Sequence, residues 1–80
     1  MYTVYILFSV SLNKYYVGST QHFDIRIDEH NRSKSKFTSK GIPWKVVKKF
    51  ELNSRPEAIL LETKIKNRGI ERYLKDINYF

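Results

Sequence analysis

Five polar side chains occupy positions where a small fold would normally place apolar ones, and together they suit phosphodiester chemistry. They are two phenols, a guanidinium, an imidazole and a carboxylate: Tyr5, Tyr16, Arg26, His30 and Glu62. A guanidinium can stabilise a phosphate through paired donors, and a carboxylate can hold a hard divalent cation. Phenols and imidazoles can exchange protons. The elements that carry these residues must therefore bring them together.

The two tyrosines lie in a predicted β-hairpin. Residues 2–8 are rich in β-branched and aromatic side chains, which is typical of a buried strand, and residues 14–18 resume this character after a turn. A turn centred on residues 10 and 11 sets Tyr5 directly opposite Tyr16. Tyrosines also pack well across strands, so a purely structural role for both is an alternative.

A short helix is predicted over residues 23–30, and its apolar face is unusual. At about 100° per residue, Arg26 and His30 fall in the same arc as Phe23 and Ile27. Each of the two polar side chains could lie at the margin of this face and reach solvent. Otherwise, both point toward the sheet.

A second helix is predicted to begin at a capping box and proline in residues 54–57, to continue through Arg68 and to end at Gly69. Glu62 falls inside its apolar arc, where an isolated carboxylate is costly to bury. Lys66 follows four residues later, in the favourable orientation for an ion pair. The sequence leaves two interpretations open, a structural ion pair and a functional carboxylate.

The remaining elements define the predicted fold class. Residues 44–51 alternate as a third strand, with Trp44, Val46 and Phe50 on one face, and residues 70–80 can form a further short helix. We predict an α+β fold, an α/β sandwich with a three-stranded antiparallel sheet flanked by helices in the order β-β-α-β-α-α. Eighty residues fit one domain, 1–80, with a shallow surface site.

The charge of the chain favours an anionic partner. Fifteen Lys and Arg against eight Asp and Glu give a formal net charge of +7. Solubility alone is the simpler explanation for this charge. If the partner is a nucleic acid, six lysines are expected to contact backbone phosphates, namely Lys34, Lys36, Lys40, Lys45, Lys48 and Lys49.

Several classes of function are excluded. The absence of cysteine rules out disulfides, Cys-based zinc sites and thiol catalysis, and the two histidines cannot complete a zinc shell. No glycine-rich phosphate loop follows a strand, so a nucleotide cofactor is not expected. No apolar run is long enough to cross a bilayer, and the first residues lack a signal peptide. We expect a cytoplasmic protein, and its oligomeric state stays open.

At these same residues the chain resembles the GIY-YIG nuclease superfamily in its compact single-domain form. The first signature is similar to Thr3-Val4-Tyr5 and the second to Tyr16-Val17-Gly18, and Arg26, His30 and Glu62 follow in the order that the family shows. The resemblance covers nearly the whole chain. Thr3 replaces the first glycine of the signature, and Phe37 stands near a position where relatives often carry a tyrosine.

The resemblance implies a DNA endonuclease with one divalent cation, Mg²⁺ or Mn²⁺, bound by Glu62. It implies that Arg26 stabilises the reacting phosphate and that Tyr5 activates water, helped by Tyr16 or His30, with His30 as an alternative proton acceptor. Little sequence specificity is expected, and a role in DNA repair or recombination would fit. The alternatives are a catalytically inactive basic module that binds nucleic acid and a small structural domain that binds a protein.

Overall fold

The computed structural model describes residues 1–32 and 39–80. Its elements, in chain order, are β1 (Tyr2–Ser9), β2 (Lys14–Thr20), α1 (Phe23–Asn31), the 3-10 turn η1 (Ser39–Gly41), β3 (Trp44–Leu52), α2 (Arg55–Arg68) and α3 (Ile70–Asp76). The strands form an antiparallel sheet in the order β2-β1-β3. This arrangement confirms the predicted α+β class and element order.

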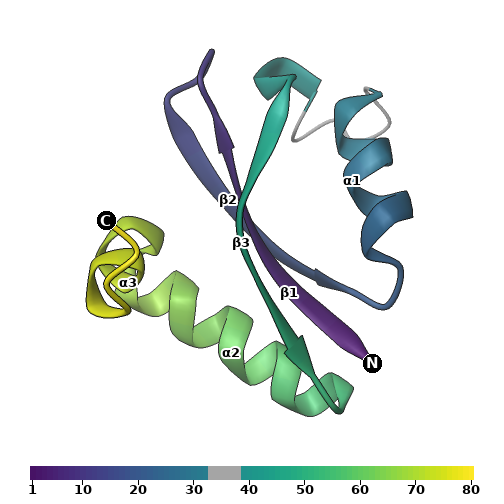
Figure 1. The fold of residues 1–80 in the computed structure, drawn as a ribbon, viewed down its shortest axis with the longest axis vertical. Helices are drawn as coiled ribbons and strands as arrows, with labels where there is room; N and C mark the ends of the chain where they lie inside the picture. The colour runs from purple at the N-terminus through teal and green to yellow at the C-terminus, as the bar shows by residue number, and fades with distance from the viewer. Residues whose placement is uncertain (33–38) are drawn as a thin grey trace.

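The sheet separates two apolar layers (Figure 1), with α1 on one face and with α2 and α3 on the other. Because side chains alternate between the two faces of the central strand β1, this strand contributes residues to both layers. Val4 and Ile6 pack with Ala58, Ile65 and Leu74 from the two C-terminal helices. The opposite face of β1 therefore supplies the layer beneath α1.

The layer beneath α1 contains the first candidate site residue. Tyr5 and Leu7 are fully buried there and pack with Trp44, while Phe23 and Ile27 cover them from α1. The apolar stripe predicted for this helix thus faces the sheet. Its N-terminal half holds the ring of Phe23 5.8 Å from that of Tyr5.

The hairpin register differs from the prediction. Ser9 pairs with Lys14, so the four-residue turn is centred between Ser11 and Leu12 instead of between Val10 and Ser11. The turn is set by Ser9 Oγ, which accepts from the Leu12 amide at 3.1 Å, and by a left-handed residue, Asn13, at φ 53°.

As a result, Tyr5 lies opposite Gly18, and Tyr16 lies opposite Leu7. The shift is two residues, and an even shift keeps every side chain on its predicted face. Tyr5 and Tyr16 are therefore diagonal neighbours on one face of the sheet, with ring centroids 6.4 Å apart.

A second correction concerns β3. The pairing with β1 shifts between Ile6 and Leu7, because Ile6 pairs with Lys48 and Leu7 with Val46, which leaves Val47 as an extra residue. Phe50 consequently packs on the face of α2 and α3, opposite Trp44. The prediction that Trp44, Val46 and Phe50 share one face was wrong for Phe50, since a bulge reverses the alternation.

The helix that carries Glu62 begins and ends as predicted. Ser54 accepts a hydrogen bond from the Glu57 amide at 3.4 Å, and the Glu57 carboxylate accepts from the Asn53 amide at 3.2 Å. Gly69 ends α2 at φ 94°, a conformation that favours glycine, and α3 begins directly after it.

Candidate active site

Tyr5 and Tyr16 meet over Gly18. A Cβ atom at Gly18 would lie 2.6 Å from the Tyr5 hydroxyl and 3.2 Å from the Tyr16 ring, so the two tyrosines occupy the space that any larger residue would need. The glycine opposite Tyr5 therefore lets the phenol lie flat across β2, toward the edge of the sheet. This gives a steric reason for the Tyr16-Val17-Gly18 sequence.

His30 contacts both phenols from the last turn of α1. Its Nε2 lies 3.0 Å from the Tyr5 hydroxyl in a buried hydrogen bond, and its ring centroid is 5.1 Å from that of Tyr16. The imidazole is almost completely buried. His30 therefore does not lie at the margin of the helix but points toward the sheet.

The electrostatics favour a neutral pair at neutral pH. Burial lowers the pKa of His30, and the positive charge of Arg26 lowers it further. Burial raises the pKa of the Tyr5 phenol, opposed by its hydrogen bond with Arg26 and reinforced by the charges of Tyr16 and Glu62. A neutral imidazole nitrogen beside a neutral phenol can accept the hydroxyl hydrogen.

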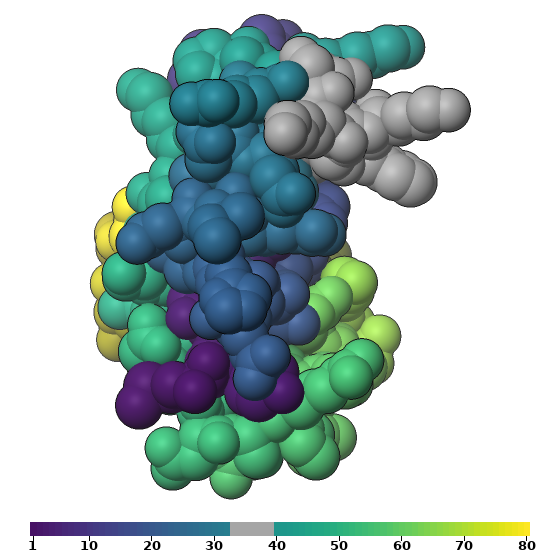
Figure 2. Space-filling model, turned by 90° about the vertical axis from the view of Figure 1, so that its right-hand side faces the viewer, coloured from purple at the N-terminus to yellow at the C-terminus, as the bar shows by residue number. Residues whose placement is uncertain are grey.

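Arg26 lies on the rim of this cluster. Its side chain is 48% exposed, its guanidinium interacts with the Tyr5 hydroxyl, and its ion pair with Glu29 is long at 3.9 Å. Figure 2 views the molecule from the side of α1, which covers the middle of this face. An arginine with one end on a buried phenol and the other in solvent is available to an incoming phosphate.

Asn31 fixes α1 against the sheet, a role that the sequence did not predict. Its amide nitrogen donates to the Trp44 carbonyl at 3.3 Å, and its amide oxygen accepts from the Trp44 backbone nitrogen at 2.7 Å. These two hydrogen bonds hold the C-terminal end of α1, next to His30, against the start of β3. Asn31 directly follows His30 in the sequence, but nothing in the sequence pointed to Trp44 as its partner.

Glu62 approaches from the other layer. It belongs to α2, and its Oε1 accepts a hydrogen bond from Ser19 Oγ at 2.8 Å. Ser19 lies on the edge strand β2 and pairs with Val4, so its side chain is on the α2 face. Ser19 is also the neighbour of Gly18. The carboxylate therefore lies at the β2 edge, around the strand from the two phenols, and its charge contributes to the raised pKa of Tyr5.

The ion pair considered from the sequence is present. Lys66 Nζ lies 2.8 Å from Glu62 Oε2, and this contact raises the pKa of Lys66. The lysine side chain is 57% exposed, whereas that of Glu62 is 20% exposed. An i, i+4 helical pair with an exposed lysine contributes only about 0.3–0.5 kcal/mol, so water or an ion can replace the lysine at low cost.

The carboxylate suits a hard cation as a single protein ligand. Among the residues that the structure describes, each oxygen of Glu62 has one partner and retains a further lone pair. Within residues 1–32 and 39–80, no three Asp, Glu, His or Cys side chains come together as a metal site. One carboxylate with water and substrate oxygens is a common arrangement for Mg²⁺. The donor set therefore fits the ion that the resemblance implies, provided that Lys66 moves aside.

Of the six lysines expected to contact phosphates, the four that the structure describes do not lie on one face of the sheet. Lys49 pairs with Tyr5 and places its Nζ 4.7 Å from the Phe23 ring, on the α1 face. Lys45 pairs with Phe8 and Lys48 with Ile6, which puts both on the opposite face. Lys40 is exposed in η1. Lys34, Lys36 and Phe37 lie outside the described residues.

The fold agrees with the comparisons. The model of the GIY-YIG catalytic domain matches residues 1–75, so the chain belongs to the GIY-YIG family. This is a family of nuclease domains, and its nucleases generally use divalent metals. The resemblance drawn from the sequence is confirmed.

A solved structure is similar over almost the whole chain. The solution NMR structure of the UPF0213 protein BH0048 from Bacillus halodurans is 28% identical with a TM-score of 0.61. The match covers 98% of this chain and 84% of that chain. No curated protein sequence matches the chain significantly. In the described part of the chain, no helix has the length and apolar character to cross a membrane.

Proposed function

We propose that this protein is a divalent-metal-dependent endonuclease that hydrolyses DNA phosphodiester bonds with little sequence specificity. The observation that carries the proposal is one cluster, in which Tyr5 and Tyr16 meet at Gly18 and His30 contacts both phenols, with Arg26 at the solvent side. A tyrosine that only packs in the core would not need a buried imidazole and an exposed guanidinium next to its hydroxyl. Such an activity would serve DNA repair or recombination.

Arg26 is proposed to bind the scissile phosphate. Its paired N–H donors match two phosphate oxygens, and its charge opposes the negative charge that grows on phosphorus during attack. Because one side of the guanidinium interacts with the Tyr5 hydroxyl, a phosphate on Arg26 would lie close to that hydroxyl. Lysine would supply the charge without the fork geometry.

Tyr5 and His30 are proposed to move the proton. As water attacks phosphorus, the Tyr5 oxygen takes up a proton from water while its own hydroxyl proton passes to Nε2 of His30. A neutral imidazole can act in this way, and its lowered pKa keeps it neutral. The raised pKa of Tyr5 argues against a pre-formed phenolate as the base. Tyr16 is proposed to support this pair from the strand edge.

Glu62 is proposed to hold the cation, with Ser19 fixing one carboxylate oxygen. When bound, a divalent cation would neutralise charge on the phosphate and on the departing 3′ oxygen. Lys66 would leave Oε2 as the cation binds, because both cannot occupy the same side of one oxygen. The six lysines are proposed to contact DNA phosphates from more than one face, without reading sequence.

A cleavage assay tests this function. Purified protein is incubated with supercoiled plasmid, single-stranded DNA and branched DNA, with Mg²⁺ or Mn²⁺, beside Glu62→Ala. We expect metal-dependent cleavage by the wild type and loss of at least about 100-fold in the variant, the usual scale for a lost catalytic group. Cleavage that survives the substitution would disprove the assignment of Glu62.

The second candidate is a basic nucleic-acid-binding module without catalysis. The closed pair of Glu62 and Lys66 favours it, because a lysine occupies the carboxylate. The same assay separates the two functions when DNA binding is measured in parallel. Metal-independent binding with no cleavage of any substrate would support the binding module.

A further inference from the structure

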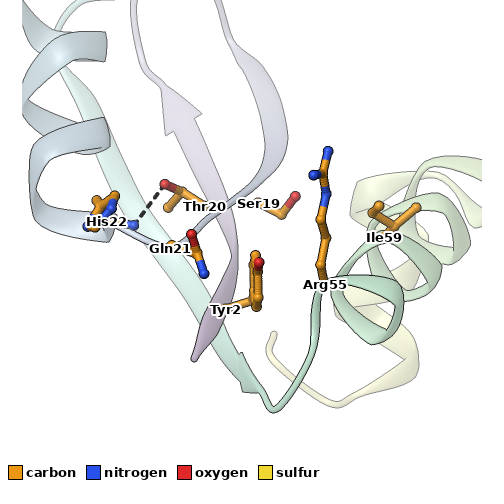
Figure 3. Close-up of a pocket in the computed structure, with 7 residues that line it drawn as sticks. All are labelled: Tyr2, Ser19, Thr20, Gln21, His22, Arg55 and Ile59. Carbon is orange, nitrogen blue, oxygen red and sulfur yellow. Dashed lines mark hydrogen bonds between the residues drawn. The ribbon is translucent and has the colours of Figure 1, made fainter.

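A cavity opens beside the proposed site, at the end of β2 that leads into α1. Its volume is about 300 Å³, and it is lined by Tyr2 from β1, Ser19 and Thr20 from β2, residues 21–22, and Arg55 and Ile59 from α2 (Figure 3). This volume is at the lower end of the range for small-ligand sites. A single nucleotide unit is of that scale, whereas a base pair is not.

The cavity offers a cation to an anionic ligand. Arg55 is exposed, and within residues 1–32 and 39–80 it forms no ion pair, in contrast to Arg26, Arg32 and Arg68. Figure 3 shows the Arg55 side chain extended from α2 past Tyr2 toward Ser19. A guanidinium in this position can bind a phosphate diester through paired donors.

The cavity also offers an aromatic surface. The ring of Tyr2 stands between Gln21 and Arg55 in Figure 3, and Tyr2 is only half-buried. Ile59 adds an exposed aliphatic side chain at the α2 wall, with 47% of its surface accessible. Aromatic and aliphatic surfaces next to a basic group are typical of sites where an unpaired base stacks.

Ser19 joins this cavity to the proposed metal ligand. The serine lines the cavity and donates its hydroxyl hydrogen to Glu62. Arg55, Ile59 and Glu62 are spaced i, i+4 and i+7 on α2, so they share one face of the helix. Arg55 and Glu62 are about 10 Å apart along the helix axis, at a rise of ~1.5 Å per residue.

We propose that this cavity is a subsite for one unpaired nucleotide next to the scissile phosphate, with Arg55 on its backbone phosphate and Tyr2 against its base. The inference rests on the proposed nuclease function, because that function places a DNA strand at Glu62. Binding of the nucleotide in the cavity does not itself require catalysis. It identifies the substrate as DNA with a single-stranded segment beside the cut. A duplex would have to unpair to use the cavity.

The test is a titration with a 5′-phosphorylated thymidine trinucleotide, without metal, followed by amide chemical shifts. We expect shifts at Thr20, Gln21, His22 and Ile59, and we expect Arg55→Gln to weaken binding about tenfold, as for loss of a charge-assisted bond. Arg72→Gln, at an exposed arginine of α3, is the matched control and should bind as the wild type does. Equal affinities of Arg55→Gln and Arg72→Gln, or shifts elsewhere only, would overturn the subsite.

Two further measurements make the result specific. A blunt-ended duplex of thymidine and adenosine strands should shift these amides much less than the trinucleotide, and equal shifts would refute the choice of an unpaired nucleotide. DNA cleavage is measured on the same wild-type and Arg55→Gln proteins, which separates the subsite from catalysis. Loss of binding in Arg55→Gln without any wild-type cleavage would keep the subsite and reject the nuclease. Cleavage by the wild type, together with unchanged trinucleotide binding in Arg55→Gln, would keep the nuclease and reject the subsite.

Discussion

The Tyr5 hydroxyl and the His30 Nε2 atom lie 3.0 Å apart in a buried hydrogen bond between the central strand and the last turn of α1. The two residues are 25 positions apart in the chain. Their contact therefore depends on α1 packing on the sheet, which the bonds from Asn31 to Trp44 secure. Any change that lifts α1 should affect the site and the core together.

The burial of His30 predicts a pH dependence of stability. Burial and the Arg26 charge lower its pKa in the folded protein, below the unfolded value of about 6.5. The unfolded chain then binds more protons than the folded one between these two values, so stability is fully present above about pH 6.5 and falls as the pH drops toward the folded pKa. Tyr5 also contacts the imidazole, but burial raises the pKa of its phenol, which therefore stays neutral between pH 7.5 and 5.5.

Urea denaturation at pH 7.5 and 5.5 measures this effect. We expect the wild type to be less stable at the lower pH, because the lowered pKa of His30 opposes its protonation in the folded protein. His30→Phe should lose less between the two pH values, whatever its own stability. His22→Phe is the matched control at an exposed histidine and should behave as the wild type does. An equal loss in His30→Phe and the wild type would show that another group is responsible.

Gly18→Ala is predicted to displace the Tyr5 phenol. The added Cβ would lie 2.6 Å from the hydroxyl and 2.8 Å from the ring carbon that bears it, which is closer than atoms pack. Overpacking of this kind costs about 1–3 kcal/mol, and movement of the hydroxyl should slow cleavage more than it weakens DNA binding. Thermal unfolding and single-turnover rates check this. Unchanged stability with unchanged cleavage would contradict the close approach.

The helices and strands follow largely from local sequence signals, whereas the contacts between them do not. The capping residues around Ser54 and Gly69 are enough to bound α2, since capping is a short-range interaction. The hairpin register was misplaced by two residues, because it depends on the side chain of Ser9 and on a left-handed Asn13. The faces of Tyr5 and Tyr16 were still predicted correctly, since a shift of two keeps the alternation.

The candidate site shows the same limit. The types of Arg26, His30 and Glu62 pointed to a common chemistry, but not to how the three lie in space. Glu62 reaches the site around the β2 edge, with Ser19 as its partner, and this contact joins residues 43 positions apart. The bulge at Val47 likewise arises from the pairing of β3 with β1.

Lys66→Gln is predicted to strengthen metal binding at Glu62. The substitution removes a positive charge 2.8 Å from Oε2 and leaves the bond from Ser19 intact. The free energy of unfolding should fall by no more than about 0.5 kcal/mol, because the pair is exposed on the lysine side. Mn²⁺ titration of the protein without DNA measures the effect, with Lys64→Gln on the exposed side of α2 as control. Weaker Mn²⁺ binding in Lys66→Gln would show that the lysine does not compete with the ion.

The central claim is that side chains from opposite layers of the sheet act on one phosphate. Single-turnover cleavage by Tyr5→Phe, Glu62→Asp and the double variant tests it most directly, because groups that act as a unit are strongly non-additive. We predict that the fold loss of cleavage rate in the double variant is far smaller than the product of the losses in the two single variants. A double variant whose loss equals that product would mean that Tyr5 and Glu62 act independently, and would contradict a shared active site.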